Sequence, residues 1–305
     1  MFKPPYPATS QSGRSALLVL GIVVILAVAA VVVLQLYASS KAETEVDRVV
    51  QDLRAQNVLD MEYSDVNFDL LSMDVVIEDV TLNAATGGAY SADRLVVSDY
   101  DIGNDFPEYM NLRLENISVP VDEKSFGPDY EKFLAMGYET LEGDLVVDFK
   151  IDRAGQRFII NELSLKAKDL GTISISLTLG QITPENFLAY LFDPSGITVD
   201  SVEIFYQDDS FAERTLAQAA REQNSTEEDL RVQALAGVDQ TIEQARQEGS
   251  ERGVAFLEAF KQFLSDPGSI RITAAPAEPV SVGRLMQAEG QFTALDLLNV
   301  STDVE

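Results

Sequence analysis

The sequence predicts an α+β fold: an N-terminal transmembrane helix, then an antiparallel β-rich domain with a C-terminal helical pair packed on or beside the sheet. Residues 16–34 are all Ala, Val, Leu or Ile except Gly21. Residues 58–207 repeatedly alternate apolar and polar side chains, the period of strands. Residues 208–266 instead space apolar side chains three and four positions apart, which indicates amphipathic helices.

The apolar stretch predicts a membrane anchor over residues 16–37, preceded by a proline-containing cytoplasmic tail at 1–15. At about 1.5 Å per residue, such a helix crosses a hydrocarbon core of about 30 Å. A cleaved signal peptide remains the alternative, because Ala38 and Ser40 are small enough for a cleavage site. The apolar run is longer than a signal peptide needs, which favours the anchor.

The orientation follows from the short, weakly basic head and the long chain beyond the anchor. Lys3 and Arg14 precede the helix, and Lys41 and Arg48 follow it. Long acidic segments translocate largely regardless of charge. We therefore expect a single-pass protein of a bacterial inner membrane, with the C-terminal domain in the periplasm.

Beyond the anchor, residues 38–57 predict an amphipathic stem helix and residues 58–207 the sheet. Residues 110–121 predict either two strands or one bulged strand. The clearest strand is 172–179, where Thr172, Ser174, Ser176 and Thr178 alternate with Ile173, Ile175, Leu177 and Leu179. Such a strand has one apolar and one polar face. A short helix is expected around 187–192.

The helical region at 208–266 begins with a helix at 211–223. Ser225 and Glu228 have the spacing of a capping box, which predicts a helix restart. Residues 267–305 predict a closing strand at 269–273 and a tail with a short helix near 295–298. Because the closing strand follows the helices, we expect one α+β unit.

Composition excludes several classes of function. The net charge is −28, and the part beyond the anchor holds all 50 acidic and 20 of the 22 basic residues, which gives −30. Such a surface repels nucleic acid, so no nucleic-acid partner is expected. The absence of His and Cys removes the usual general base, thiol catalysis and most metal ligands. We expect no enzyme, no cofactor and no metal site.

Two polar segments have simple structural interpretations. Asp99, Asp101, Asn104 and Asp105 form a carboxylate cluster, but the spacing of a calcium-binding loop fails at Gly103. A solvated turn is the favoured interpretation. Lys124 and Ser125 are expected to lie in a loop.

The candidate lipid- or partner-facing side chains are the apolar ones of strand 172–179 and a phenylalanine stripe in the following helices. They are Ile173, Ile175, Leu177, Leu179, Phe256 and Phe260. Core packing is the competing interpretation of both groups, since a helix stripe covers a sheet face as readily as a ligand does.

Residues 63–100, with YSDVNFDLLSMDVVIEDVTL and GGAYSADRLVVSDY, resemble the first strands of the AsmA/TamB class of envelope proteins. The resemblance covers about 40 residues plus the anchor. It implies a sheet groove, open along one side and lined with apolar side chains, associated with phospholipid passage between membranes. The chain also resembles uncharacterised single-pass periplasmic proteins of alphaproteobacteria through DPGSIRITAAPAEPVSVGRLM and LDLLNVS, which implies no activity.

Two functions follow as expectations. The first is a non-catalytic, membrane-anchored envelope protein that handles lipid or maintains the membrane through an apolar sheet face. The second is a scaffold or partner-binding subunit of an envelope complex that uses the 208–266 helices. A sheet face left uncovered by the helices favours the first, and an exposed apolar stripe on the helices favours the second.

Overall fold

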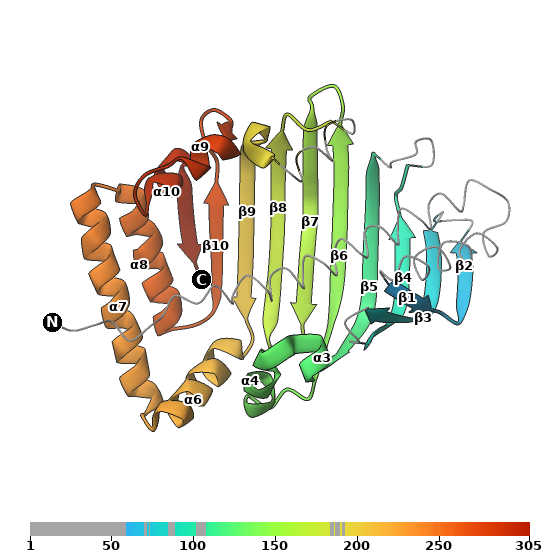
Figure 1. The fold of residues 1–305 in the computed structure, drawn as a ribbon, viewed down its shortest axis with the longest axis horizontal. Coiled ribbons are helices and arrows are strands. Elements are labelled where there is room, and N and C mark those ends of the chain that lie inside the picture. The colour runs from blue at the N-terminus through green and yellow to red at the C-terminus, as the bar shows by residue number, and fades with distance from the viewer. Residues whose placement is uncertain are drawn as a thin grey trace.

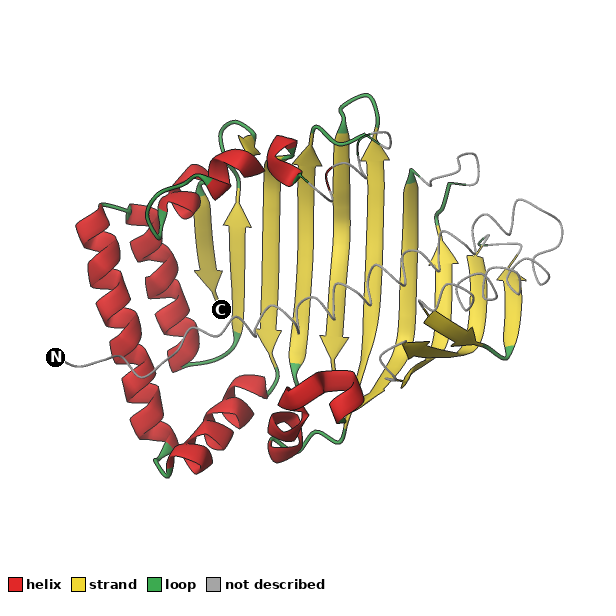
Figure 2. Ribbon diagram, viewed as in Figure 1, coloured by secondary structure: helices red, strands yellow, loops and turns green. Residues whose placement is uncertain are grey.

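The computed structural model of the chain describes residues 59–69, 72, 74–84, 89–101, 108–183, 186, 190 and 193–305. They form one large antiparallel sheet with helices at one end and short helices along both rims (Figures 1 and 2). The expected tail at 1–15, anchor at 16–37 and stem at 38–57 lie outside these residues, as does most of 187–192. Within the part described, no helix has both the length and the apolar character needed to span a bilayer.

The sheet runs in the order β1-β3-β4-β5-β6-β7-β8-β9-β10-β12, with β2 also on β3 and β11 on β9. Each neighbouring pair is antiparallel. The strands are β1 (Leu59–Glu62), β2 (Asp65–Asp69), β3 (Asp74–Ala84), β4 (Ala89–Ser98), β5 (Tyr109–Pro120), β6 (Thr140–Asp152), β7 (Arg157–Ala167), β8 (Gly171–Gly180), β9 (Thr198–Asp208), β10 (Ser269–Ala274), β11 (Val280–Ser281) and β12 (Val300–Val304).

The strand registers align apolar side chains in rows across the sheet. One row runs through Leu114, Leu145, Leu165, Ile173, Tyr206 and Ile270 on six successive strands. A second runs through Leu112, Val147, Leu163, Ile175, Ile204 and Ile272. Directly paired residues project to the same side of a sheet, so one face is continuously apolar from β5 to β10.

Strands β3 and β5 each contain one residue in the left-handed backbone conformation. Strand β3 continues through Asp79, which has φ 50°, without a register shift against β4. The region 110–121 is one bulged strand, β5, whose register shifts between Leu114 and Ile117. Asn116 lies in this bulge with φ 54°. Asp and Asn tolerate this left-handed conformation better than most residues, which is why they occupy these positions.

The main hydrophobic core lies at the β1–β6 end of the sheet. Its fully buried members include Ile77, Leu95, Val97, Met110 and Leu112. These side chains come from three neighbouring strands, β3, β4 and β5, and lie in adjacent rows of the apolar face. Fully burying a side chain of this size contributes about 1.5–3 kcal/mol, so this end supplies much of the stability.

Short helices cover the rim where β5 ends and β6 begins, at the bottom of Figure 1. They are α3 (Glu123–Phe126), the 3-10 turn Gly127–Asp129 and α4 (Tyr130–Ala135). The loop expected around Lys124 and Ser125 is therefore wrong. The Asp122 carboxylate accepts the Ser125 backbone N–H at 2.8 Å and caps α3.

The C-terminal helical region contains three helices: α6 (Phe211–Gln223), α7 (Glu227–Glu248) and α8 (Glu251–Ser265). The Thr226 hydroxyl caps α7 by accepting the Asp229 N–H at 3.1 Å, one position beyond the expected Ser225. Helix α7 packs on α8, and α8 packs against β12 and β10. The pair thus stands at the β12 end of the sheet (Figure 2).

The closing strand is present as β10, paired with β9 in the expected return to the sheet. The remaining tail is more ordered than the sequence indicates. The short helix expected near 295–298 is present as α10 (Thr293–Leu297). The tail adds α9 (Val282–Met286) and β12, which pairs with β10 along its whole length. A further 3-10 turn, Pro194–Gly196, precedes β9.

Candidate functional site

The candidate site is the apolar face of β7, β8 and β9, which we call the apolar strip. Four rows of paired side chains make it up. They are Leu165, Ile173 and Tyr206; Leu163, Ile175 and Ile204; Ile160, Leu177 and Val202; and Phe158, Leu179 and Val199. The strip continues the apolar face of the neighbouring strands without a polar interruption.

The apolar face is buried on β6 and only partly buried on β7, whose strip side chains pack against the edge of the main core. Leu145, Val147 and Phe149 on β6 are buried. Of the strip residues, Val199 alone is buried; the others are partly exposed, and Ile173 reaches 39%. Large apolar side chains rarely stay open to water in contiguous groups unless the surface binds something.

Helix α8 borders the strip on the β10 side. The Phe263 ring meets the Tyr206 ring edge-on, with the centroids 5.9 Å apart. Beyond this contact, Ile270, Ala274 and Val300 are buried on β10 and β12. The helical pair therefore covers the end of the apolar face and leaves β7 and β8 to one side.

Polar groups lie at the end of the strip near Tyr206 and Ile173. The Tyr206 hydroxyl donates to Asp208 Oδ1 at 2.7 Å, and the same oxygen accepts the Ala212 N–H at 3.0 Å. Partial burial, followed by the hydrogen bond to Asp208, raises the pKa of the Tyr206 hydroxyl. The phenol therefore stays neutral and acts as a donor at physiological pH.

A cation–π contact lies next to the Tyr206 end of the strip. The Tyr138 hydroxyl donates to the Asp169 carbonyl at 3.0 Å. The Arg214 guanidinium lies 4.7 Å from the Tyr138 ring centroid and donates to the Met136 carbonyl at 3.3 Å. These contacts tie α6 to the end of α4 and to the turn between β7 and β8.

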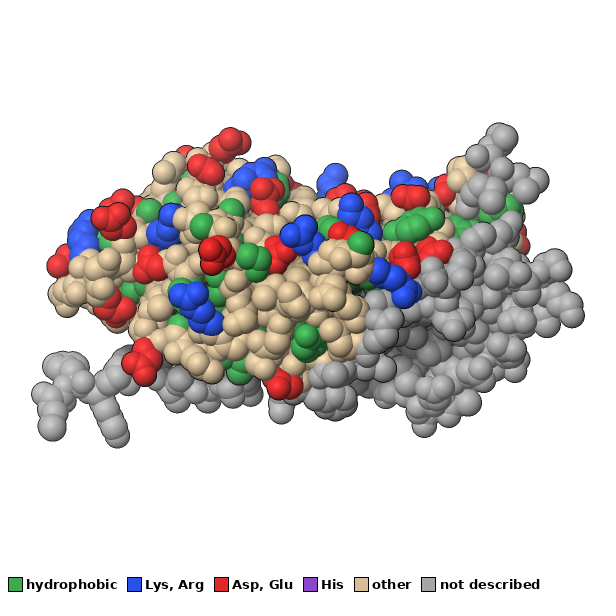
Figure 3. Space-filling model, turned by 90° about the horizontal axis from the view of Figure 1, so that it is seen from above, with side chains coloured by type: hydrophobic (Ala, Val, Ile, Leu, Met, Phe, Trp, Pro, Cys, Tyr) green, Lys and Arg blue, Asp and Glu red, His purple; other side chains and the backbone are tan. Residues whose placement is uncertain are grey.

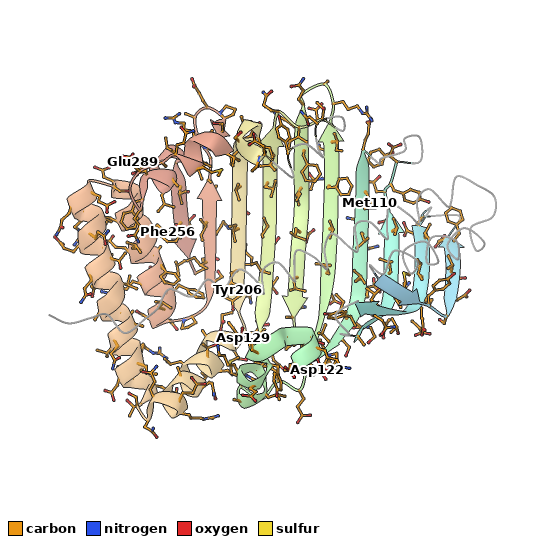
Figure 4. All side chains as sticks on the ribbon, in the orientation of Figure 1. Met110, Asp122, Asp129, Tyr206, Phe256 and Glu289 are labelled. Carbon is orange, nitrogen blue, oxygen red and sulfur yellow. The ribbon has the colours of Figure 1, made fainter. Side chains whose placement is uncertain are left out.

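The structure divides the sequence-predicted residues between two places. Ile173, Ile175, Leu177 and Leu179 share the apolar face of β8, as the alternation indicates. Phe256 and Phe260 lie on α8 with their rings stacked at 6.4 Å. Figure 4 labels Phe256 on α8 and Tyr206 near the C-terminal end of β9.

Phe256 belongs to a separate cluster. It packs against buried Ile242, Ala245, Leu257 and Phe292. The two phenylalanines therefore do not join the β8 side chains in one surface. Sequence reasoning did not select the strip residues of β7 and β9, although their alternating pattern is visible; choosing them required the strand registers.

The opposite face of these strands is polar. It carries Thr172, Ser174 and Ser176 of β8, and Phe205 of β9 lies under the Arg271 guanidinium at 4.8 Å from the ring centroid. The Arg157–Asp200 ion pair at 3.1 Å joins β7 to β9, and the Arg94–Glu115 pair at 3.2 Å links β4 and β5 farther along the sheet. This face is a solvated surface.

The acidic side chains of the described residues do not gather into a metal site. No group of three or more His, Cys, Asp or Glu side chains there is placed to hold a metal ion. Asp101 Oδ2 accepts the Glu108 N–H at 3.1 Å, and Asp99 adopts φ 45°. Residues 102–107, with the rest of the acidic cluster, lie outside the described part.

Comparison with protein families gives a match to the C-terminal part of the chain. A family model described as "Uncharacterized protein" matches residues 164–305. This region is less than half of the 305-residue chain and contains β8, β9 and the helices α6–α8. No curated protein matches the sequence significantly.

Proposed function

We propose that this protein is a non-catalytic envelope protein that binds lipid acyl chains on the apolar strip. The supporting observation is the partly exposed apolar face of β7 and β8, left uncovered by the helical pair at the β12 end. The predicted anchor at 16–37 would hold the strip near a bilayer. The resemblance of residues 63–100 to AsmA/TamB proteins agrees with this role.

The dimensions of the strip suit an acyl chain. Ile173 and Leu179 are six residues apart on β8, which corresponds to about 20 Å along the strand. One leaflet of a bilayer has a hydrocarbon thickness of about 15 Å, half of the roughly 30 Å core. The strip is therefore long enough for an acyl chain to lie along β8. Each CH₂ group that the strip shields from water contributes about 0.8 kcal/mol.

The scaffold alternative would use the helices α6–α8. Their large apolar side chains mostly face inward: Leu230, Ile242 and Ala245 of α7 are buried, as are Leu257 and Phe263 of α8. Val232, 56% exposed, is the large hydrophobic residue of these described helices that stands most open. A single side chain of this kind is normal on a soluble surface, so lipid binding is the better-supported proposal.

The test compares lipid content and folding in three versions of the full-length chain. Ile175→Asp places a carboxylate on the strip, and Ser176→Asp places the same group on the opposite face of the same strand. After extraction in a mild detergent, lipid is quantified by mass spectrometry and the melting temperature is recorded. We expect lipid to be lost from Ile175→Asp and retained in Ser176→Asp.

Ile173→Asp is a second strip variant that separates loss of lipid binding from unfolding. The Ile173 side chain is 39% exposed, so the folded protein can carry a charge at this position. A folded Ile173→Asp or Ile175→Asp protein with unchanged lipid content contradicts the proposal. So does a wild-type protein that never carries lipid.

A further inference from the structure

The apolar strip is closed at one end and open at the other. At the Leu179 end, Val199 and Val280 are paired and both buried, and Ile182 just beyond β8 is 2% exposed. At the opposite end Ile173 is 39% exposed. A lipid whose chain lies along β8 would therefore leave its headgroup at the Ile173 end.

Aspartates lie near this open end. Asp208 pairs directly with Gly171, two residues from Ile173, and so lies on the strip side of the sheet. Asp209 donates its backbone N–H to the Leu170 carbonyl at 3.1 Å, which places it beside the β7–β8 turn that contains Asp169. The electrostatic influence of Asp208 and Asp209 reaches the Tyr206 hydroxyl.

The cations near this end already have partners. Lys168 Nζ lies 2.9 Å from Glu142 Oε2. Arg214 stacks on Tyr138 and donates to Ser210 Oγ and the Met136 carbonyl. Lys166, the next basic residue of β7, alternates with Leu165 and projects from the opposite face.

The charge of the surface as a whole also disfavours an anionic headgroup. The net charge is −28, and Figure 3 shows acidic side chains interspersed with basic ones over the part of the described surface seen there. A negatively charged headgroup at the Ile173 end would meet the carboxylates of Asp169, Asp208 and Asp209, opposed by the Arg214 guanidinium that stacks on Tyr138 and donates to neutral oxygens. An ammonium-bearing headgroup would meet complementary charge.

We infer that the strip selects lipids with a zwitterionic, ammonium-bearing headgroup over anionic lipids, with the headgroup seated between Ile173 and Asp209. This inference rests on the proposed function, since it specifies the ligand of the same strip. The selection is electrostatic and therefore weakens as salt shortens the Debye length from about 10 Å at 0.1 M to about 3 Å at 1 M.

The test uses the full-length chain in detergent, equilibrated with vesicles of equal parts phosphatidylethanolamine and phosphatidylglycerol with identical acyl chains. Bound lipid is extracted and quantified by headgroup. We expect at least a threefold enrichment of phosphatidylethanolamine at low salt and a smaller one at high salt. Asp209→Lys should abolish or reverse the enrichment while total bound lipid stays unchanged.

Glu162→Lys is the matched control, because it makes the same change in net charge on an exposed residue of β7 away from the turn. Asp169→Asn is a second variant, since Asn tolerates the φ of 60° at this position; it should reduce the enrichment.

The outcomes separate the inference from the proposed function. Equal binding of both lipids overturns the headgroup inference and leaves lipid binding intact. Equal shifts in Asp209→Lys and Glu162→Lys overturn it as well, because the preference would then come from overall charge. Absence of bound lipid in the wild-type chain overturns both.

Discussion

The edge-on contact between Phe263 and Tyr206 joins helix α8 to the apolar face of β9 and marks where that face passes from covered to open. The centroids are 5.9 Å apart, a favourable geometry for aromatic pairs. On the β10 side Ile270 and Ala274 are buried; on the β8 side the apolar face is partly exposed. The same contact thus stabilises the helical unit and limits the width of the strip.

Removing the Phe263 ring should destabilise the domain. The side chain is 7% exposed, and Phe→Ala changes at buried positions typically cost about 3–5 kcal/mol. We expect Phe263→Ala to lower the unfolding free energy by about that amount in chemical denaturation. The neighbouring exposed Gln262→Ala is the control and should stay within about 0.5 kcal/mol of wild type. Equal stability of the two variants would show that α8 is not anchored through this ring.

Tyr206 should make stability fall at alkaline pH. Folding raises the pKa of its hydroxyl above the ordinary value of 10.0, so the folded state holds this proton more tightly than the unfolded chain. The resulting stabilisation is complete below that pH and is lost as pH rises above it. Denaturation between about pH 9 and about pH 11 should show a shallower decline for Tyr206→Phe than for wild type. The exposed Tyr109→Phe is the control, and identical slopes for wild type and Tyr206→Phe would refute the assignment.

Asn116 should be replaceable by Gly but not by Val. Its backbone has φ 54°, its N–H donates to Asp144 Oδ1 at 2.9 Å, and its side-chain amide donates to Asp93 Oδ2 at 2.8 Å. A left-handed conformation costs an L-residue roughly 1–2 kcal/mol, and a β-branched side chain is especially disfavoured there. We expect Asn116→Val to lose roughly 1.5–3.5 kcal/mol, strain and the lost hydrogen bond together, and Asn116→Gly to lose about 1 kcal/mol. Similar losses measured by urea unfolding would mean that the bulge tolerates any residue.

The strands were the most predictable part of the fold. Period-two alternation locates β6, β7 and β8, because each strand has one apolar and one polar face. The α3–α4 rim was missed because its helices are short and interrupted by Gly127 and Pro128. Strand β12 was missed because five mostly polar residues carry a weak signal.

The candidate site was only half predictable, for a related reason. Periodicity identifies an apolar face but not what packs on it. The Phe256 and Ile175 stripes look equivalent in the sequence, yet one packs into a cluster with Ile242 and Phe292 while the other remains partly exposed. That distinction depends on long-range contacts between α8, α10 and β12.

The predicted anchor at 16–37 gives a separate prediction on topology. Arg at a helix centre costs roughly 3 kcal/mol of insertion free energy, so Val24→Arg should release or misroute the protein, whereas Val24→Leu should not. Protease added to intact spheroplasts should digest the wild-type chain beyond about residue 41. Protection in spheroplasts with cleavage in inverted vesicles would reverse the orientation.

Photo-crosslinking with a phospholipid that carries a photoreactive group in its acyl chain tests lipid binding on the strip most directly. The full-length chain is illuminated in vesicles that contain this lipid, and modified peptides are mapped by mass spectrometry. The account predicts labelling of strip residues such as Leu163, Ile175 and Ile204, in addition to any labelling within 16–37. Labelling confined to 16–37, or equal labelling of the polar-face residues Ser174 and Ser176, would contradict it.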